Sequence, residues 1–115
     1  MHLSMFHNPR CSKSRQTLKL LQDRGLEPEI VEYLKTPPST EELRHILGLL
    51  GLAPRALMRR KERVYREAGL DVPSLDDTAL IQAMVDHPIL IERPIVLARG
   101  KAVLGRPPEK VLEIV

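Results

Sequence analysis

The stretch HLSMFHNPRCSKSRQTLKLLQDRG, residues 2–25, decides the fold, because it contains the patterns of a strand, a turn and a helix in succession. Residues 2–6 partly alternate between apolar and polar side chains, which predicts a strand. Residues 12–24 carry leucines at helical spacing and stop at Gly25, a residue type that commonly follows a helix C-terminus. A β-branched-rich strand is predicted at residues 29–33, and two strands that flank one helix predict a parallel β-α-β unit.

The middle of the chain predicts a helical insertion at about residues 39–87. Ser39 and Glu42 match a capping box, which opens the first helix of this insertion. Residues 55–68 predict a second, strongly charged helix, and the segment SLDDTALIQAMVDHP at residues 74–88 predicts a third.

The segment RPIVLARGKAVLG, residues 93–105, predicts a β-hairpin. Its first strand, turn and second strand are expected at residues 95–98, 99–101 and 102–104. A last amphipathic helix is expected from about residue 108 to residue 114. The order β-α-β, helical insert, β-β-α predicts an α/β, thioredoxin-like fold over a single domain at residues 1–115. Its four-stranded mixed sheet would contain two parallel strands plus an antiparallel hairpin.

The composition fits a globular protein and indicates neither a nucleic-acid partner nor a membrane partner. Of the 115 residues, 43% are hydrophobic and 29% are charged. The net charge of +3 is mild, and no cation cluster is interleaved with aromatic residues, so we expect no nucleic-acid partner. No apolar stretch approaches the ~20 residues that span a bilayer, so we expect no membrane association. The absence of a signal peptide and of an internal disulfide predicts a cytoplasmic protein, and a monomer is expected because no apolar helix face is left over.

Cys11, the only cysteine, lies between the predicted first strand and the predicted first helix. Backbone N–H groups and the helix dipole at such a position favour the thiolate, and they lower a thiol pKa from about 8.5 by one to several units. Arg10, Lys13 and Arg15 add positive charge, and His7 lies close by at the strand end. These features predict an activated nucleophile. The alternative is a buried structural cysteine, which the polar, turn-forming neighbours disfavour.

The motif around the cysteine is Cys11-x-x-Ser14, with serine where a dithiol oxidoreductase has a second cysteine. Ser14 cannot resolve a disulfide, but its hydroxyl can donate a hydrogen bond to the Cys11 sulfur and so favour the thiolate. Ser12 and Ser14 could also bind an oxyanion at the helix N-terminus, or they could serve as ordinary helix caps.

Three arginines, Arg59, Arg93 and Arg106, are candidates for holding an oxyanion, because arginine presents forked donors and stays charged. In a thioredoxin-like layout, the turn before the third strand carries a cis-proline beside the active cysteine. This layout predicts a cis Arg93–Pro94 bond, with Arg93 pointing toward Cys11. Ordinary surface arginines remain the alternative, because spacing alone cannot show that they converge. No spacing of histidine, cysteine or carboxylate residues matches a metal site, so no metal is expected.

Five segments together make the chain similar to a known family. They are HNPRCSKSR, YLKTPPS, RALMRRKE, HPILIERPIV and GRPPEKVLEI. In this order and spacing they resemble the ArsC-type arsenate reductase family. The resemblance is to the branch that uses glutathione and glutaredoxin, and especially to its short bacterial members. It covers nearly the whole chain and implies a thioredoxin-like fold with a helical insert.

The resemblance also implies residue roles. Cys11 matches the family's nucleophilic cysteine, His7 matches the histidine that tunes the thiol, and Arg59, Arg93 and Arg106 match the oxyanion-binding arginines. It implies that the Cys11 thiolate attacks arsenate, that glutathione attacks the adduct, and that glutaredoxin removes the glutathione as arsenite leaves. Arsenate, glutathione and glutaredoxin are therefore the expected partners, with glutathione as co-substrate and no bound cofactor.

Two other functions stay open at the sequence level. One is a glutathione-dependent reductase of another substrate. The other is a non-enzymatic, redox-related transcriptional regulator that binds RNA polymerase, as a related branch of this fold does through a Cys-x-x-Cys pair. The Cys-x-x-Ser motif and the three arginines favour arsenate reduction over the regulator.

Overall fold

A computed structural model describes residues 2–115 and divides the chain into two compact units. We call the first the sheet unit; it combines the chain up to Thr36 with Arg93–Val115. The second, the helical unit, spans Pro37–Glu92 and so includes the predicted insertion at 39–87. The prediction of one domain over residues 1–115 stays a prediction.

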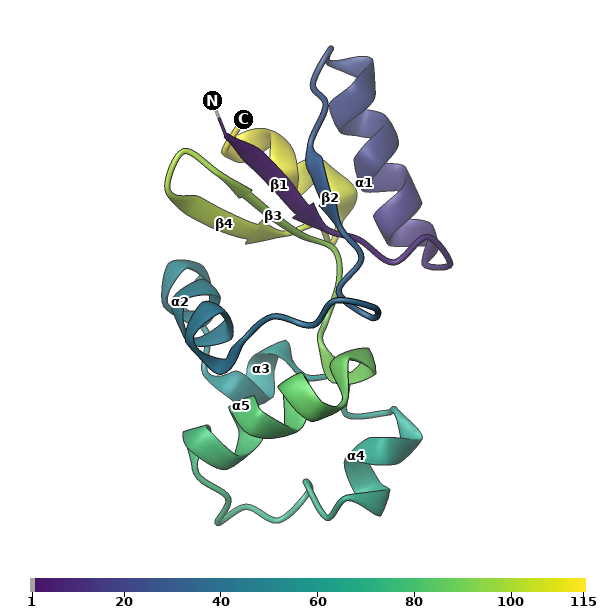
Figure 1. Cartoon of the computed structure of the whole chain (residues 1–115). Helices are drawn as coiled ribbons and strands as arrows, with labels where there is room; N and C mark the ends of the chain where they lie inside the picture. The colour runs from purple at the N-terminus through teal and green to yellow at the C-terminus, as the bar shows by residue number, and fades with distance from the viewer. Residues whose placement is uncertain (1) are drawn as a thin grey trace. The chain divides into compact units, whose positions relative to one another are not determined.

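The sheet unit contains the four-stranded mixed sheet that the sequence predicts (Figure 1). Its strands are β1 Leu3–Phe6, β2 Glu29–Val31, β3 Ile95–Ala98 and β4 Lys101–Leu104. Their order is β2-β1-β3-β4, with β1 and β2 parallel and the other two pairs antiparallel. The α/β, thioredoxin-like arrangement is thereby confirmed.

Helix α1, Ser12–Asp23, and the 3₁₀ helix η2, Pro108–Glu113, pack against each other and against the sheet (Figure 1). The core between them is aliphatic; its buried members are Leu3, Met5, Leu21, Val96, Ala98 and Val111. The amphipathic helix expected at 108–114 is therefore a 3₁₀ helix. Its backbone bonds span three residues, as from the Lys110 N–H to the Pro107 carbonyl at 3.1 Å, which is usual for a short terminal segment.

The hairpin between β3 and β4 has a two-residue turn, since Ala98 pairs with Lys101. Both turn residues have positive φ, 55° at Arg99 and 73° at Gly100. Turns of this kind match the right-handed twist of the strands that they join. Strand β4 therefore begins at Lys101, one residue before the predicted start.

The helical unit contains four α-helices and one 3₁₀ helix within the described chain (Figure 1). They are α2 Thr40–Leu50, α3 Pro54–Leu57, α4 Arg63–Glu67, α5 Asp77–Asp86 and η1 Pro88–Leu90. The predicted capping box is confirmed, because the Ser39 hydroxyl accepts from the Glu42 N–H at 3.1 Å while the Glu42 carboxylate accepts from the Ser39 N–H at 3.4 Å.

The single helix predicted at residues 55–68 is wrong, because two short helices, α3 and α4, occupy this stretch. Between them, Met58 forms an antiparallel bridge with Ile91, and the Arg59 N–H donates to the Leu90 carbonyl at 2.7 Å. These bonds take backbone groups that a continuous helix would need, so pairing with a distant segment overrides the helical pattern.

No helix within residues 2–115 is long and apolar enough to cross a membrane.

Candidate active site

Asn8 organises the turn that leads from β1 to α1. Its side-chain oxygen accepts from the Arg10 N–H at 3.0 Å, and its carbonyl accepts from the Cys11 N–H at 2.9 Å. Its own buried N–H donates to the Ser14 hydroxyl at 3.4 Å. Asn8 is 5% exposed, so the polar groups that shape this turn are themselves inside the protein. The turn fixes the backbone on both sides of Cys11.

Cys11 is the N-cap residue of α1, with φ −91° and ψ 125°. An N-cap side chain normally accepts a hydrogen bond from the N–H of the second or third helical residue. Burial alone raises the pKa of the thiol, but hydrogen bonds from the backbone N–H groups of Ser14 and Lys13 and from the Arg93 side chain outweigh it. Together with the charge of Arg93, they lower the pKa of Cys11 from 9.0 to about 7. Cys11 thus occupies the N-cap position without a side-chain capping hydrogen bond of standard geometry, and the donors and the charge around it favour its thiolate.

Ser14 contributes to the thiolate through its backbone. Its hydroxyl accepts from the Asn8 N–H and can still donate its own hydrogen, so the predicted donation to the Cys11 sulfur stays a prediction. The hydrogen bond that lowers the pKa of Cys11 comes from the Ser14 backbone N–H. Ser14 is fully buried, so it also anchors the first turn of α1 to the loop.

Arg93 reaches the thiol from the start of β3. The Arg93–Pro94 peptide bond is cis, as the thioredoxin-like layout predicts, and Arg93 is 8% exposed. Its side-chain hydrogen bond and its positive charge both lower the pKa of Cys11. Of the three predicted arginines, Arg93 is the one whose contact with the thiol the structure describes.

Arg106 lies just after β4 and belongs to the same unit as Cys11. Its Nη1 donates to the Arg93 carbonyl at 3.1 Å, so it supports the backbone of the arginine that contacts the thiol. Arg106 is exposed, and the Arg106–Pro107 bond is also cis. The sequence did not predict this second cis bond.

Arg59 belongs to the helical unit, where two carboxylates hold it. Its Nη1 donates to Glu92 at 2.9 Å and its Nε donates to Glu62 at 3.3 Å. Burial lowers the pKa of Arg59, but the two acids outweigh burial and raise it, so the guanidinium stays charged. The two contacts fix the plane of the guanidinium. Binding of an oxyanion by Arg59 stays a prediction.

His7 is buried at the end of β1, with 7% exposure. Burial lowers the pKa of His7. The negative charge of Glu32 raises this pKa and the positive charge of Arg15 lowers it, and the net shift is downward, so the neutral imidazole is favoured. Its Nδ1 finds no hydrogen-bond partner within residues 2–115. His7 is not among the groups that shift the pKa of Cys11, so its predicted tuning of the thiol stays a prediction.

Comparison with known proteins identifies the family. A sequence model of the ArsC family matches residues 6–114. This chain belongs to the ArsC family. The match extends over both the sheet unit and the helical unit.

Several relatives match this ArsC-family chain over nearly its whole length. A protein of Escherichia coli K12 named uncharacterized protein YfgD is 59% identical, over 98% of this chain and 96% of that protein. An arsenate reductase of Neisseria meningitidis serogroup A is 56% identical, over 95% and 94%. The solved structure of an arsenate reductase from Vibrio cholerae is 52% identical, with a TM-score of 0.97 over 100% of this chain and 98% of that one.

Gly105 shapes the site in this ArsC-family chain, although sequence reasoning gave it no role. A Cβ at Gly105 would lie 2.7 Å from the Thr17 hydroxyl oxygen and 2.8 Å from the ring of Pro94. The Gly105 N–H also donates to the Pro94 carbonyl at 3.0 Å. Any other residue would push apart α1 and the loop that carries Arg93. The only signal in the sequence is a glycine directly before Arg106, which by itself does not indicate a close approach.

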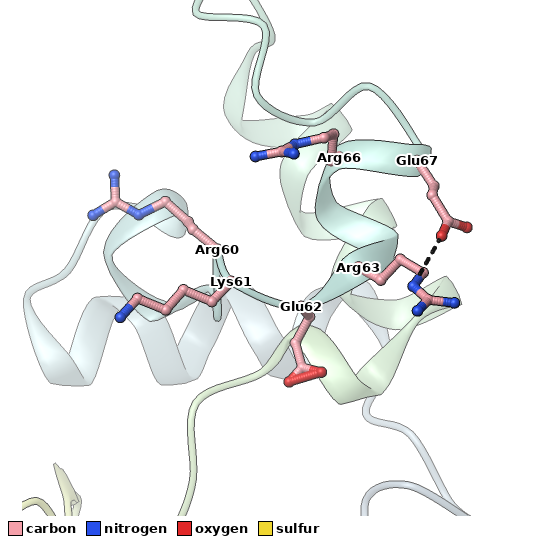
Figure 2. A pocket seen from close by; sticks show the side chains of 6 residues that line it. All are labelled: Arg60, Lys61, Glu62, Arg63, Arg66 and Glu67. Atoms are coloured by element: carbon pink, nitrogen blue, oxygen red, sulfur yellow. Dashed lines mark ion pairs between the residues drawn. The ribbon is translucent and has the colours of Figure 1, made fainter.

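The helical unit carries a charged hollow close to α4 (Figure 2). It is lined by Arg60, Lys61, Glu62, Arg63, Arg66 and Glu67. Its acids are already engaged, since Glu62 binds Arg59 and Glu67 pairs with Arg63 at 3.6 Å. The Arg63–Glu67 pair is largely exposed, and such pairs contribute little to stability. We interpret this hollow as solvated surface.

Within the described residues, no group of three or more histidine, cysteine, aspartate or glutamate side chains is placed to hold a metal ion.

Proposed function

We propose that this chain is an arsenate reductase, which converts arsenate to arsenite with Cys11 as nucleophile. One observation carries the proposal: Cys11 lies at the N-terminus of α1 beside Arg93, with its pKa lowered to about 7. About half of the thiol is then thiolate at neutral pH, and a thiolate next to a charged guanidinium is suited to attack an oxyanion. The relatives that are named arsenate reductase support this choice of substrate.

The first step forms a sulfur–arsenic bond. Arg93 and Arg106, which belong to the same unit as Cys11, hold the arsenate dianion and offset its repulsion of the thiolate, and a role for Arg59 stays a prediction from the family resemblance. The Cys11 sulfur attacks arsenic, and one arsenate oxygen leaves as hydroxide, or as water once it is protonated. Arsenic remains As(V) in this adduct, so reduction requires two electrons from elsewhere.

Two external thiols supply those electrons. Glutathione attacks the arsenic of the adduct and displaces a second oxygen as hydroxide or water. Glutaredoxin then attacks the sulfur of the bound glutathione, and the two leave as a mixed disulfide while the electron pair stays on arsenic. Water hydrolyses the bond between the Cys11 sulfur and the resulting As(III), so that arsenite departs and Cys11 returns to its thiolate form. One cysteine is then sufficient in this chain. Free thiols of this kind require a reducing compartment, so we propose that the protein acts in the cytoplasm, as a monomer.

A coupled assay tests the proposal. Arsenate, glutathione, glutaredoxin and glutathione reductase are mixed with the chain, and the loss of NADPH absorbance is followed. We expect arsenate-dependent oxidation of NADPH that disappears in Cys11→Ser and when either glutathione or glutaredoxin is omitted. Turnover that Cys11→Ser retains would refute the assigned nucleophile, and turnover without glutathione would refute the assigned donor.

A further inference from the structure

A cavity of about 280 Å³ opens beside the turn that carries Cys11. Its floor is formed by buried His7 and Asn8, and its rim includes Arg10, Glu32, Leu34 and Lys35. All of these residues belong to the sheet unit. The Asn8 carbonyl binds the Cys11 N–H at 2.9 Å, so the floor of the cavity is one wall of the cysteine turn. None of the steps of arsenate binding described above uses this cavity.

The residues that line the cavity carry charges of both signs. Arg10 and Lys35 offer two cations, and Glu32 offers one carboxylate, 3.7 Å from the Lys35 ammonium. Leu34 is 38% exposed, which is high for a large apolar side chain, and it gives the rim an apolar element. A ligand that matches this arrangement carries two carboxylates, one ammonium and a short, weakly polar body.

We propose that this cavity binds glutathione and holds it beside the Cys11 turn. Glutathione has two carboxylates for Arg10 and Lys35, one ammonium for Glu32, and peptide groups that can lie over Leu34. The volume is close to the lower end of the roughly 300–1,000 Å³ found for small-molecule sites, so the cavity takes most of a tripeptide and leaves the rest in solvent. The inference rests on the proposed function, because it gives that function's thiol donor a binding site.

Glu32 and Lys35 pair with each other at the cavity. Each charge partly neutralises the other at 3.7 Å, and both side chains are substantially exposed, so the pair is weak and exchangeable. An incoming ammonium and carboxylate can replace the two partners without leaving either charge buried and unpaired.

Binding can be measured without turnover by using S-methylglutathione, whose blocked sulfur cannot react. The ligand is titrated into the ¹⁵N-labelled full chain without arsenate, and amide shifts are followed by NMR. We expect shifts at His7, Asn8, Glu32 and Lys35. We also expect at least about fivefold weaker binding for Lys35→Gln and for the ligand with both carboxylates esterified.

Lys101→Gln is the matched control, because it removes the same charge from an exposed position in the same unit. Leu3 pairs with Ala98 and Phe6 with Ile95, so the hairpin turn before Lys101 lies at the opposite end of β1 from His7. Lys101→Gln should bind as the unchanged chain does. Iodoacetamide should alkylate Cys11 in Lys35→Gln at the unchanged rate, since Lys35 does not shift the thiol pKa.

Three results would overturn the inference: no shifts, shifts confined to residues outside the cavity, or equal weakening in Lys35→Gln and Lys101→Gln. If arsenate turnover is present while the cavity binds nothing, the inference fails and the proposed function stands. If S-methylglutathione binds as expected while arsenate is not reduced, the site stands and the proposed function fails.

Discussion

Replacing Arg93 with glutamine should slow the reaction of Cys11 with alkylating reagents. Arg93 favours the thiolate in two ways, through a side-chain hydrogen bond and through its charge. Glutamine can keep a hydrogen bond but removes the charge. The pKa of Cys11 should therefore rise from about 7 toward 9.0, while the backbone N–H groups of Ser14 and Lys13 continue to hold it below that limit.

The size of the effect follows from the thiolate fraction. With a pKa of about 7, about half of Cys11 is ionised at pH 7. A rise of one pKa unit leaves about one tenth ionised, which makes alkylation about fivefold slower. A complete return to 9.0 would leave about 1% ionised, so the loss is bounded at about fiftyfold.

The assay is the rate of iodoacetamide alkylation measured across a pH series, with the pKa read from the midpoint of the curve. Arg24→Gln serves as the control, because Arg24 is exposed at the C-terminal end of α1, remote from its N-cap. The curve of Arg24→Gln should coincide with that of the unchanged chain. An identical midpoint in Arg93→Gln and the unchanged chain would refute the assigned role of Arg93.

Three further predictions follow from the site. Gly105→Ala should destabilise the fold by about 1–3 kcal/mol in urea unfolding, because its Cβ would meet the Thr17 hydroxyl; unchanged stability would contradict the close approach. Since burial lowers the pKa of His7 below 6.5, the unfolded chain binds the proton better, and stability should fall as the pH drops below about 6.5. His7→Gln should flatten that decline, and an equal decline in both proteins would contradict this origin. Arg59→Gln should raise the KM for arsenate about fivefold and leave Cys11 alkylation unchanged, because it removes a proposed oxyanion ligand that is not among the groups shifting the pKa of Cys11; an unchanged KM would count against Arg59 as an oxyanion ligand.

The sequence was most informative where local chemistry determines the structure. Strand β3 begins and ends where predicted, because a proline precedes it and a tight turn follows it. The capping box at Ser39 and the left-handed Gly51, with φ 67°, determine both ends of α2. Cys11 at the start of α1 could be predicted for the same reason, since a turn-forming segment followed by a helical pattern places it there.

Some contacts between segments that are distant in the chain could not be predicted from the sequence. Nothing local in residues 55–68 indicates that Met58 pairs with Ile91 and divides the expected helix. Neither does the spacing show that Arg106 supports the Arg93 carbonyl, since the sequence suggests only that both bind an oxyanion. The role of the Ser14 backbone N–H depends on the position of Cys11 at the N-cap, whose geometry a residue pattern does not specify.

The most direct test of the central claim is to measure arsenite itself. The chain is incubated with arsenate, glutathione and glutaredoxin, and the two arsenic species are separated by chromatography and quantified by mass spectrometry. We predict that the unchanged chain forms arsenite, with one mixed disulfide of glutathione and glutaredoxin for each arsenite, and that Cys11→Ser forms none above the protein-free mixture. Equal arsenite from the unchanged chain and from Cys11→Ser would contradict the account.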